Sequence, residues 1–339
     1  MPFHHPPIAH IRPLRRMGVA ALAVVALTGV AASCSSDDSA DDTTTTAAGS
    51  EAASETTVTD TGPRTVEHAM GSTEVPAAPE KVVVLDSSML DSAVALGVTP
   101  VGATEGLAGA GLPPYLGEDV TDDVELVGLT ESPNLEAIAA LQPDLIIGAK
   151  VRHEGIYDQL SQIAPTVFSE SSGTDWQSQV RLTGDALNRA DAAEELLSDF
   201  ETRAAEVGEA IGAEGTTATI VRFIPGQIRL YGPATFSGSV LTAVGFDLGD
   251  QGYDPQYGMA VISAENIDSV DTDVLFATNP EAESDGQVQS DRASLGTRWE
   301  NLSVVQAGQQ FDITDQTWMT GIGVLGANRI LDDLEEWLG

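Results

Sequence analysis

The chain has 339 residues, of which 42% are hydrophobic and 20% charged, as is typical of a globular protein with one large domain or two ordinary ones. Lys and Arg number 15 against 52 Asp and Glu, so the formal net charge is −37. This charge excludes nucleic acid as a partner, and the presence of one Cys excludes an intramolecular disulfide.

Residues 1–33 are expected to form a lipoprotein signal peptide. Three arginines precede an apolar run over 18–32, which is shorter than the roughly 20 residues of a membrane-spanning helix. Small residues then lead into Cys34, and this arrangement resembles a bacterial lipobox, in which the cysteine thiol receives a diacylglycerol. We therefore expect an exported protein, lipid-anchored through Cys34 to the outer face of the cytoplasmic membrane.

Residues 34–63 are expected to form a disordered tether. They are rich in Thr, Ser and acidic residues, contain no basic residue, and offer almost nothing to bury. Such a segment cannot compensate the entropy lost on ordering. The alternative for Cys34, a buried thiol, therefore lacks a core next to it.

Residues 64–170 show the pattern of a first α/β lobe. Apolar, β-branched runs predict strands at 82–85, 98–101, 144–148 and 166–168. Helical segments alternate with these strands. Ser88 and Asp91 stand at capping-box spacing and predict the start of the first helix. Strands that alternate with helices predict βαβ units and a parallel sheet.

Residues 171–213 are expected to form a bridging helix. Their hydrophobic residues recur every three to four positions, which predicts two abutting helices or one broken helix of nearly forty residues. Residues 214–339 then repeat the alternation of strands and helices and predict a second α/β lobe. The expected fold is two α/β lobes joined by a long helix.

Five segments of the folded part resemble ferric-siderophore substrate-binding lipoproteins of ABC importers, of the iron-hydroxamate type: PEKVVVLDSSMLDSAVALGVTPVG, NLEAIAALQPDLIIG, RHEGIYDQLSQIAPTVF, VRFIPGQIRLYG and VLGANRILDDLEEWL. The resemblance implies a class III periplasmic-binding-protein fold with the ligand in a cleft between the lobes. It further implies a monomeric receptor that delivers a ferric siderophore to an ABC permease for iron uptake. The siderophore would hold the iron, so neither enzymatic activity nor a cofactor is expected.

Cationic and aromatic side chains are the expected ligand contacts, because guanidinium groups suit siderophore oxygens and aromatic faces suit the siderophore body. Arg152 follows a strand at the sheet edge where open α/β folds place ligands, with a surface ion pair to Glu154 as the alternative. The other candidates are Arg222, Arg229, Tyr231 and Trp318. Solvent exposure is the alternative for the arginines, and burial in the core is the alternative for Trp318.

Haem or a corrinoid is the alternative ligand class, since His153 and Tyr231 come from opposite lobes and could ligate haem. Direct metal binding is not expected, because the mature chain keeps only His68 and His153. An exported enzyme is the third alternative, although no nucleophile motif is present.

Asp91 matches a carboxylate that, in this family, can dock into an arginine pocket of the permease; the alternative is the capping box with Ser88. Gly321, Gly323 and Gly326 spell a dinucleotide-binding motif, G-x-G-x-x-G. Only 13 residues follow Gly326 (339 minus 326), too few for the required βαβ unit, so the motif predicts a helix start instead.

Overall fold

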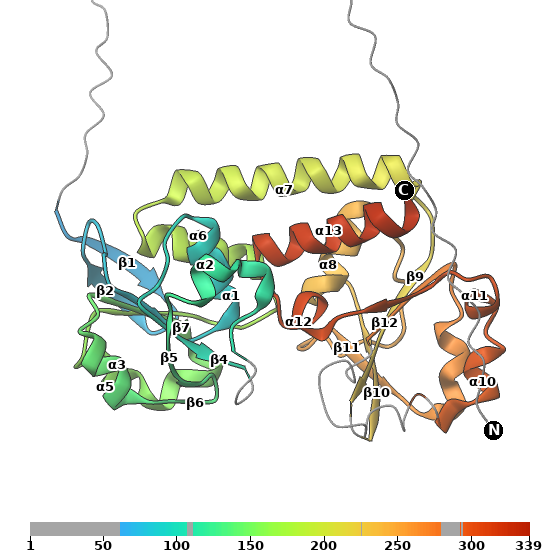
Figure 1. The fold of residues 1–339 in the computed structure, drawn as a ribbon, viewed down its shortest axis with the longest axis horizontal. Coiled ribbons are helices and arrows are strands. Elements are labelled where there is room, and N and C mark those ends of the chain that lie inside the picture. Colours follow the sequence, from blue (N-terminus) through green and yellow to red (C-terminus); the bar gives the residue numbers. More distant parts are fainter. Residues whose placement is uncertain (1–61, 107–110, 225, 279–291, 293) are drawn as a thin grey trace, which may run out of the picture. The chain divides into compact units, whose positions relative to one another are not determined.

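The computed structural model describes residues 62–106, 111–224, 226–278, 292 and 294–339. They form two α/β lobes that lie side by side beneath a long helix (Figure 1). The predicted signal peptide, Cys34 and all but the last two residues of the predicted tether lie outside the described residues. Within the described part, no helix is both long and apolar enough to cross a membrane.

The N-terminal lobe is built on a sheet with the strand order β6-β5-β4-β3-β7-β8, in which only the pairing of β5 with β6 is antiparallel. Its strands are β3 (Val82–Val84), β4 (Gly102–Glu105), β5 (Glu125–Leu129), β6 (Ser132–Pro133), β7 (Leu145–Ala149) and β8 (Thr166–Ser169). A hairpin of β1 (Arg64–His68) and β2 (Gly71–Val75) precedes them.

The helices of this lobe cover both faces of the sheet. They are α1 (Ser87–Ala95), η1 (Pro114–Leu116), α2 (Glu118–Thr121), α3 (Leu135–Leu141), α4 (Lys150–His153), η2 (Glu154–Ile156), α5 (Tyr157–Ser161) and α6 (Trp176–Ala186). Val84 and Ile147 belong to the core on the face of α1 and α6, whereas Val83 and Ile146 belong to the core on the face of α3 and α5. Burial on both faces explains why these strands are continuously apolar.

The C-terminal lobe is built on a sheet with the strand order β11-β10-β9-β12-β13. Its strands are β9 (Ala218–Ile224), β10 (Gln227–Tyr231), β11 (Met259–Ile262), β12 (Val274–Thr278) and β13 (Gln310–Ile313). Its helices are α8 (Phe236–Val244), η3 (Ala264–Val270), α10 (Thr297–Glu300), α11 (Ser303–Gln306), α12 (Asp315–Trp318) and α13 (Val324–Leu338). Strands β9, β12 and β13 are parallel, so their carboxyl ends share one edge.

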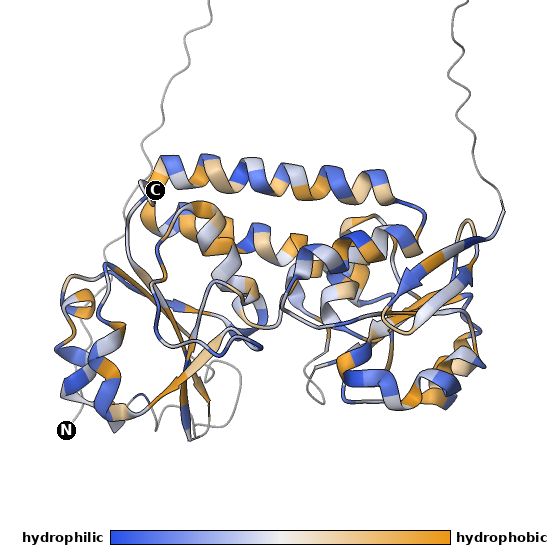
Figure 2. Cartoon of the chain, turned by 180° about the vertical axis from the view of Figure 1, so that it is seen from behind, coloured by the Kyte–Doolittle hydropathy of each residue, from blue (hydrophilic) through white to orange (hydrophobic). Residues whose placement is uncertain are grey.

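The bridge between the lobes is α7 (Ala190–Ile211), which runs along the top of both (Figure 1). The structure has two helices in this region, α6 and α7, as the first of the two predicted alternatives has it. However, α6 packs against α1 within the N-terminal lobe, so α7 alone spans both lobes. Figure 2 shows that α7 carries hydrophobic and hydrophilic residues along its whole length. Its buried residues, among them Leu197, Phe200 and Val207, recur at helical spacing.

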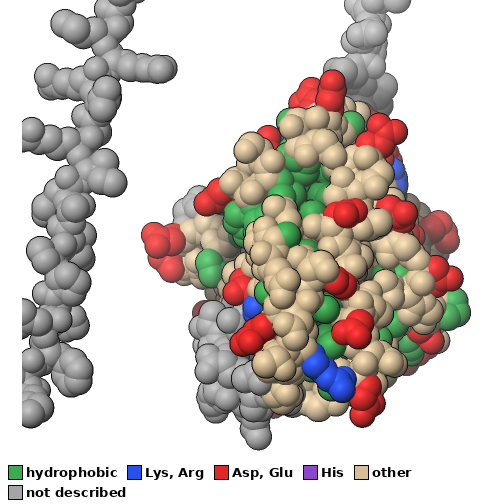
Figure 3. All heavy atoms as spheres, turned by 90° about the vertical axis from the view of Figure 1, so that its right-hand side faces the viewer, with side chains coloured by type: hydrophobic (Ala, Val, Ile, Leu, Met, Phe, Trp, Pro, Cys, Tyr) green, Lys and Arg blue, Asp and Glu red, His purple; other side chains and the backbone are tan. Residues whose placement is uncertain are grey.

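The described surface of the C-terminal lobe reflects the acidic composition. Figure 3 shows one end of the molecule, where Asp and Glu side chains are scattered over the face and Lys and Arg are few. Basic side chains are therefore rare in this protein, and those that line a cavity are candidates for contacts with an anionic ligand.

Candidate ligand-binding site

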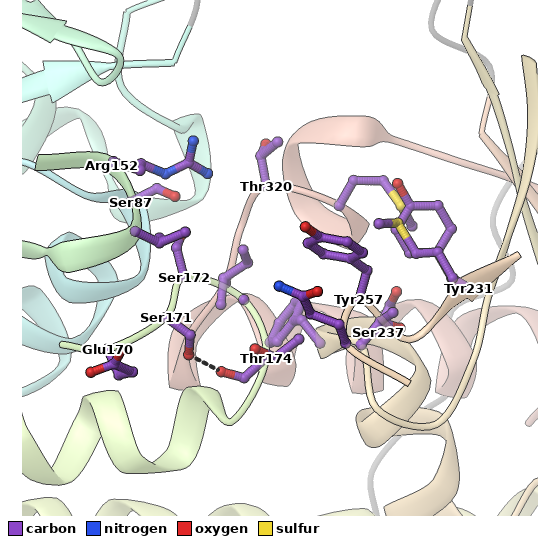
Figure 4. A pocket seen from close by; sticks show the side chains of 18 of the residues that line it. Ser87, Arg152, Glu170, Ser171, Ser172, Thr174, Tyr231, Ser237, Tyr257 and Thr320 are labelled. Carbon is purple, nitrogen blue, oxygen red and sulfur yellow. Dashed lines mark hydrogen bonds between the residues drawn. The ribbon is translucent and has the colours of Figure 1, made fainter. Parts of the chain in front are cut away.

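A cavity of about 930 Å³ lies between the two lobes. The N-terminal lobe contributes Ser87, Glu131, Lys150, Val151, Arg152, Glu154, Gly155, Glu170, Ser171, Ser172, Gly173 and Thr174. The C-terminal lobe contributes Arg222, Tyr231, Thr235, Phe236, Ser237, Gln256, Tyr257, Met259, Trp318, Met319, Thr320 and Ile322. Figure 4 shows Arg152 and Ser87 on one wall and Tyr231, Tyr257 and Ser237 on the other.

The strand topology explains why polar side chains meet here. Ser87 follows β3, Arg152 follows β7, and the segment 170–174 follows β8, so all three leave the carboxyl ends of parallel strands. The chain leaves β3 toward β4 on one side, while β7 lies on the other side of β3. A crevice outside the carboxyl ends at such a switch point is the usual ligand position in open α/β sheets.

Arg152 is held by two carboxylates. Its Nε donates to Asp86 Oδ2 at 3.1 Å, and its Nη1 donates to Glu131 Oε1. Asp86 is buried and is itself fixed, because it accepts hydrogen bonds from Ser88 N, Ser88 Oγ and Ser172 Oγ. Asp86 is also the N-cap of α1, so the predicted capping box of Ser88 with Asp91 is wrong.

Arg222 lies opposite, on β9. Its Nη2 donates to Asp315 Oδ2 at 2.5 Å and its Nη1 donates to the Tyr231 hydroxyl at 3.1 Å. Burial lowers the pKa of Arg222, but Asp315 and Tyr231 raise it by more, so the guanidinium stays charged. Its buried Nε has no hydrogen-bond partner among the described residues.

Two predicted ligand contacts are placed differently from these arginines. Trp318 borders the cavity but has no exposed surface; its Nε1 donates to Asp333 at 2.8 Å and its ring stacks on Phe276. Arg229 is not among the residues that line the cavity, and its Nε donates to Gln227 at 3.0 Å. Of the five predicted contacts, the structure thus brings four to the cavity, one of them wholly buried.

Tyr257 is a candidate contact that sequence reasoning missed. It is 55% exposed, lines the cavity and lies near Tyr231 and Ser237 (Figure 4). An exposed aromatic ring within a cavity offers an apolar face at little conformational cost. The sequence gives little indication of this role, because Tyr257 lies in a loop that contains Gly, Asp and Pro. In such a loop neither helical nor strand periodicity distinguishes a buried face from an exposed one.

Asp91 does not lie where a permease could reach it. It is fully buried, and its carboxylate accepts hydrogen bonds from the backbone N–H groups of Leu325 and Gly326 at 3.0 and 2.9 Å. Burial raises the pKa of Asp91 to about 7, although these N–H donors lower it. Asp91 thus caps the amino end of α13, and its burial leaves no surface through which the expected docking to a permease could take place.

The glycine motif before α13 builds the site for Asp91. A Cβ at Gly323 would lie 2.2 Å from the Asp91 carboxylate, and a Cβ at Gly326 would lie 1.6 Å from the Gly321 carbonyl oxygen. The motif is therefore a helix start, as predicted, and the carboxylate of the first lobe takes the place of an external anion.

His153 is not free to ligate haem. It is buried, its Nδ1 accepts from Ala149 N at 3.2 Å, and its Nε2–H donates to the Thr130 carbonyl oxygen at 2.8 Å. Burial lowers the pKa of His153, which favours the neutral ring. Across the described residues, no group of three or more His, Cys, Asp or Glu could hold a metal ion.

The cavity is not positive overall. Its basic side chains are Lys150, Arg152 and Arg222, and its acidic side chains are Glu131, Glu154 and Glu170. Asp86 and Asp315 add two carboxylates directly behind the arginines. The arginines are therefore placed among acids that balance them, and an anionic ligand must compete with those acids.

Comparisons with known proteins agree with this architecture. A family model described as "Periplasmic binding protein" matches residues 82–317. The chain is 37% identical over 296 residues to the probable siderophore-binding lipoprotein YfiY of Bacillus subtilis (strain 168), covering 84% of this chain and 91% of that protein. It is 31% identical over 267 residues to the achromobactin-binding periplasmic protein of Dickeya dadantii (strain 3937), covering 77% and 87%. The crystal structure of Staphylococcus aureus SirA complexed with staphyloferrin B superposes with a TM-score of 0.72 and 32% identity, covering 80% of this chain and 97% of that chain.

Proposed function

The chain belongs to the periplasmic binding protein family, and from this premise we propose that it captures a ferric siderophore in the cavity between its lobes and delivers it to an ABC importer. The relatives support this ligand class, since two of them are named for siderophore or achromobactin binding and one is complexed with staphyloferrin B. Binding and release without chemical conversion is the role, so the protein acts as a receptor and not as an enzyme.

The observation that carries the proposal is the position of Arg152 and Arg222. They come from different lobes and line the same cavity, so one ligand between the lobes can contact both guanidinium groups. Planar guanidinium groups match the carboxylate, hydroxamate and phenolate oxygens of a siderophore. The siderophore supplies the iron ligands in this proposal, Tyr231 and Tyr257 flank its body, and Trp318 lies buried behind the cavity wall.

The cellular setting follows from the sequence. Lipidation of Cys34 would anchor the protein to the outer face of the cytoplasmic membrane, and residues 34–63 would tether the lobes near an ABC permease. The name of YfiY as a lipoprotein supports the anchor. We propose a monomeric receptor, because one chain supplies both walls of the cavity.

Titration with ferric siderophores tests the proposal. Because Trp318 borders the cavity, binding of a coloured ferric complex should quench tryptophan fluorescence. The ligand-free protein should bind the complex with a submicromolar dissociation constant. Arg222→Gln should weaken binding at least tenfold. Arg229→Gln is the matched control, because Arg229 is paired with Arg222 across β9 and β10 yet lies outside the cavity lining.

Two results would contradict the proposal. One is the absence of binding to any ferric hydroxamate, catecholate or carboxylate siderophore. The other is tight binding of haem, seen as a Soret band near 400 nm, without binding of any ferric siderophore. The structure speaks against haem binding, because both ring nitrogens of His153 are engaged in hydrogen bonds.

A further inference from the structure

A carboxylate of the chain itself already binds one hydrogen-bond donor of the Arg152 guanidinium group. Glu131 belongs to the two-residue turn between β5 and β6, and its Oε1 accepts a hydrogen bond from Arg152 Nη1. Both residues line the cavity. The Glu131 carboxylate therefore lies on Arg152 where a carboxylate of a ligand would lie.

The two acids on Arg152 differ in how firmly they are held. The side chain of Asp86 is 1% exposed and receives three further hydrogen bonds, from Ser88 and Ser172. The side chain of Glu131 is 68% exposed, and Arg152 is the hydrogen-bond partner that the described residues give its carboxylate. Exposed ion pairs contribute little to stability, so Asp86 fixes the guanidinium while Glu131 can leave it.

The charge balance of the cavity gives this difference a consequence. With Glu131 in place, the acidic side chains of the lining equal the basic ones, and an anionic complex is not attracted. When the Glu131 side chain turns into solvent, Arg152 Nη1 becomes free to donate to a ligand carboxylate in the same position.

We propose that Glu131 is a displaceable competitor for Arg152, and that the preferred ligand is a ferric siderophore with a carboxylate that takes the place of Glu131. The inference rests on the proposed function and refines its ligand class. A neutral trihydroxamate complex has no carboxylate, and its hydroxamate oxygens are already bound to iron, so it competes less well with Glu131 for Arg152. Glu131 thereby sets both the affinity for carboxylate ligands and the selectivity against neutral ones.

Glu131→Gln tests the inference, with three carboxylate-bearing probes, Fe(III)–citrate, Fe(III)–staphyloferrin B and Fe(III)–achromobactin, and with ferrichrome as the neutral trihydroxamate probe. Glu131→Gln should strengthen binding of the preferred carboxylate probe about fivefold and change binding of ferrichrome less than twofold. The matched control is Glu170→Gln, because Glu170 also lines the cavity and is exposed but pairs with Lys150. This control removes the same charge and should change affinity less than twofold.

A double-mutant cycle separates displacement from general electrostatics. In the Arg152→Gln background, Glu131→Gln should no longer strengthen binding, because the site of competition is absent. Equal gains from Glu131→Gln and Glu170→Gln, or a gain that survives in Arg152→Gln, would overturn the inference. Binding of ferrichrome alone, by wild type and variant alike, would also overturn it but leave the proposed function intact. Failure of every ferric siderophore to bind would remove the proposed function as well.

Discussion

The ring Nε2–H of His153 donates to the carbonyl oxygen of Thr130 at 2.8 Å, one residue away from the ion pair of Arg152 with Glu131. Two adjacent residues of α4 thus hold two adjacent residues of the β5–β6 turn. His153 is the buried part of this contact, and Arg152 is the part that faces the cavity. The histidine therefore positions the turn that carries Glu131.

The lowered pKa of His153 predicts a loss of stability in mild acid. The folded state keeps the ring neutral, while the unfolded chain takes up a proton near pH 6.5. The contribution of His153 is therefore complete above pH 6.5 and is lost as the pH falls through the lowered folded-state pKa. Urea unfolding at pH 7, 6 and 5 should show a smaller decline for His153→Gln than for wild type. Parallel declines would contradict this assignment, and His68, whose pKa is also lowered by burial, accounts for a remaining decline in the variant.

Asp91 predicts the opposite pH dependence. Its folded-state pKa of about 7 lies above the ordinary value of 3.8, so its contribution to stability is complete below about pH 4 and is lost as the pH rises to about 7. Asp91→Asn does not titrate. The unfolding free energy of wild type minus that of Asp91→Asn should therefore fall over this range, by no more than about 4 kcal/mol. A difference that stays constant from pH 4 to 7 would show that the pKa of Asp91 is not raised and that its carboxylate is ionised throughout this range.

The packing of α7 on α8 depends on Gly208. A Cβ at this position would lie 1.9 Å from the Val244 carbonyl oxygen, so Gly208→Ala should force the helices apart. We expect the free energy of unfolding to decrease by about 1–3 kcal/mol, although Ala has a higher helix propensity than Gly. Gly155→Ala is the control, since nothing lies within 4 Å of its added Cβ, and its melting temperature should stay within about 1 °C of wild type. Equal melting temperatures for the two variants would contradict the close approach.

Tyr257 should contribute to ligand affinity and not to folding. It is 55% exposed, so Tyr257→Ala leaves no cavity in the core, whereas a bound siderophore would lose an aromatic surface. Fluorescence titration should show binding weakened about fivefold at an unchanged melting temperature. Val261→Ala, at a residue that is 64% exposed and outside the cavity lining, is the control and should bind like wild type.

Local patterns in the sequence were sufficient for the architecture and the family. Continuous apolar runs predicted β3, β7 and β8, and the family motifs led to two α/β lobes, which the structure and the comparisons confirm. The exception is the strand expected at 98–101, because β4 begins at Gly102. The apolar run 98–101 leads into β4 but precedes it, because the register pairs Gly102 with Val83 of β3.

The sequence by itself determined which segments are buried, because burial on one or both faces of a helix or strand requires a periodic pattern of apolar residues. Only the tertiary structure decided what each polar residue does. Asp91 meets an N–H group 235 positions away, and His153 meets a carbonyl oxygen 23 positions away. No local spacing encodes such a distance, and a buried polar group must take whichever partner the packed elements bring within hydrogen-bond reach.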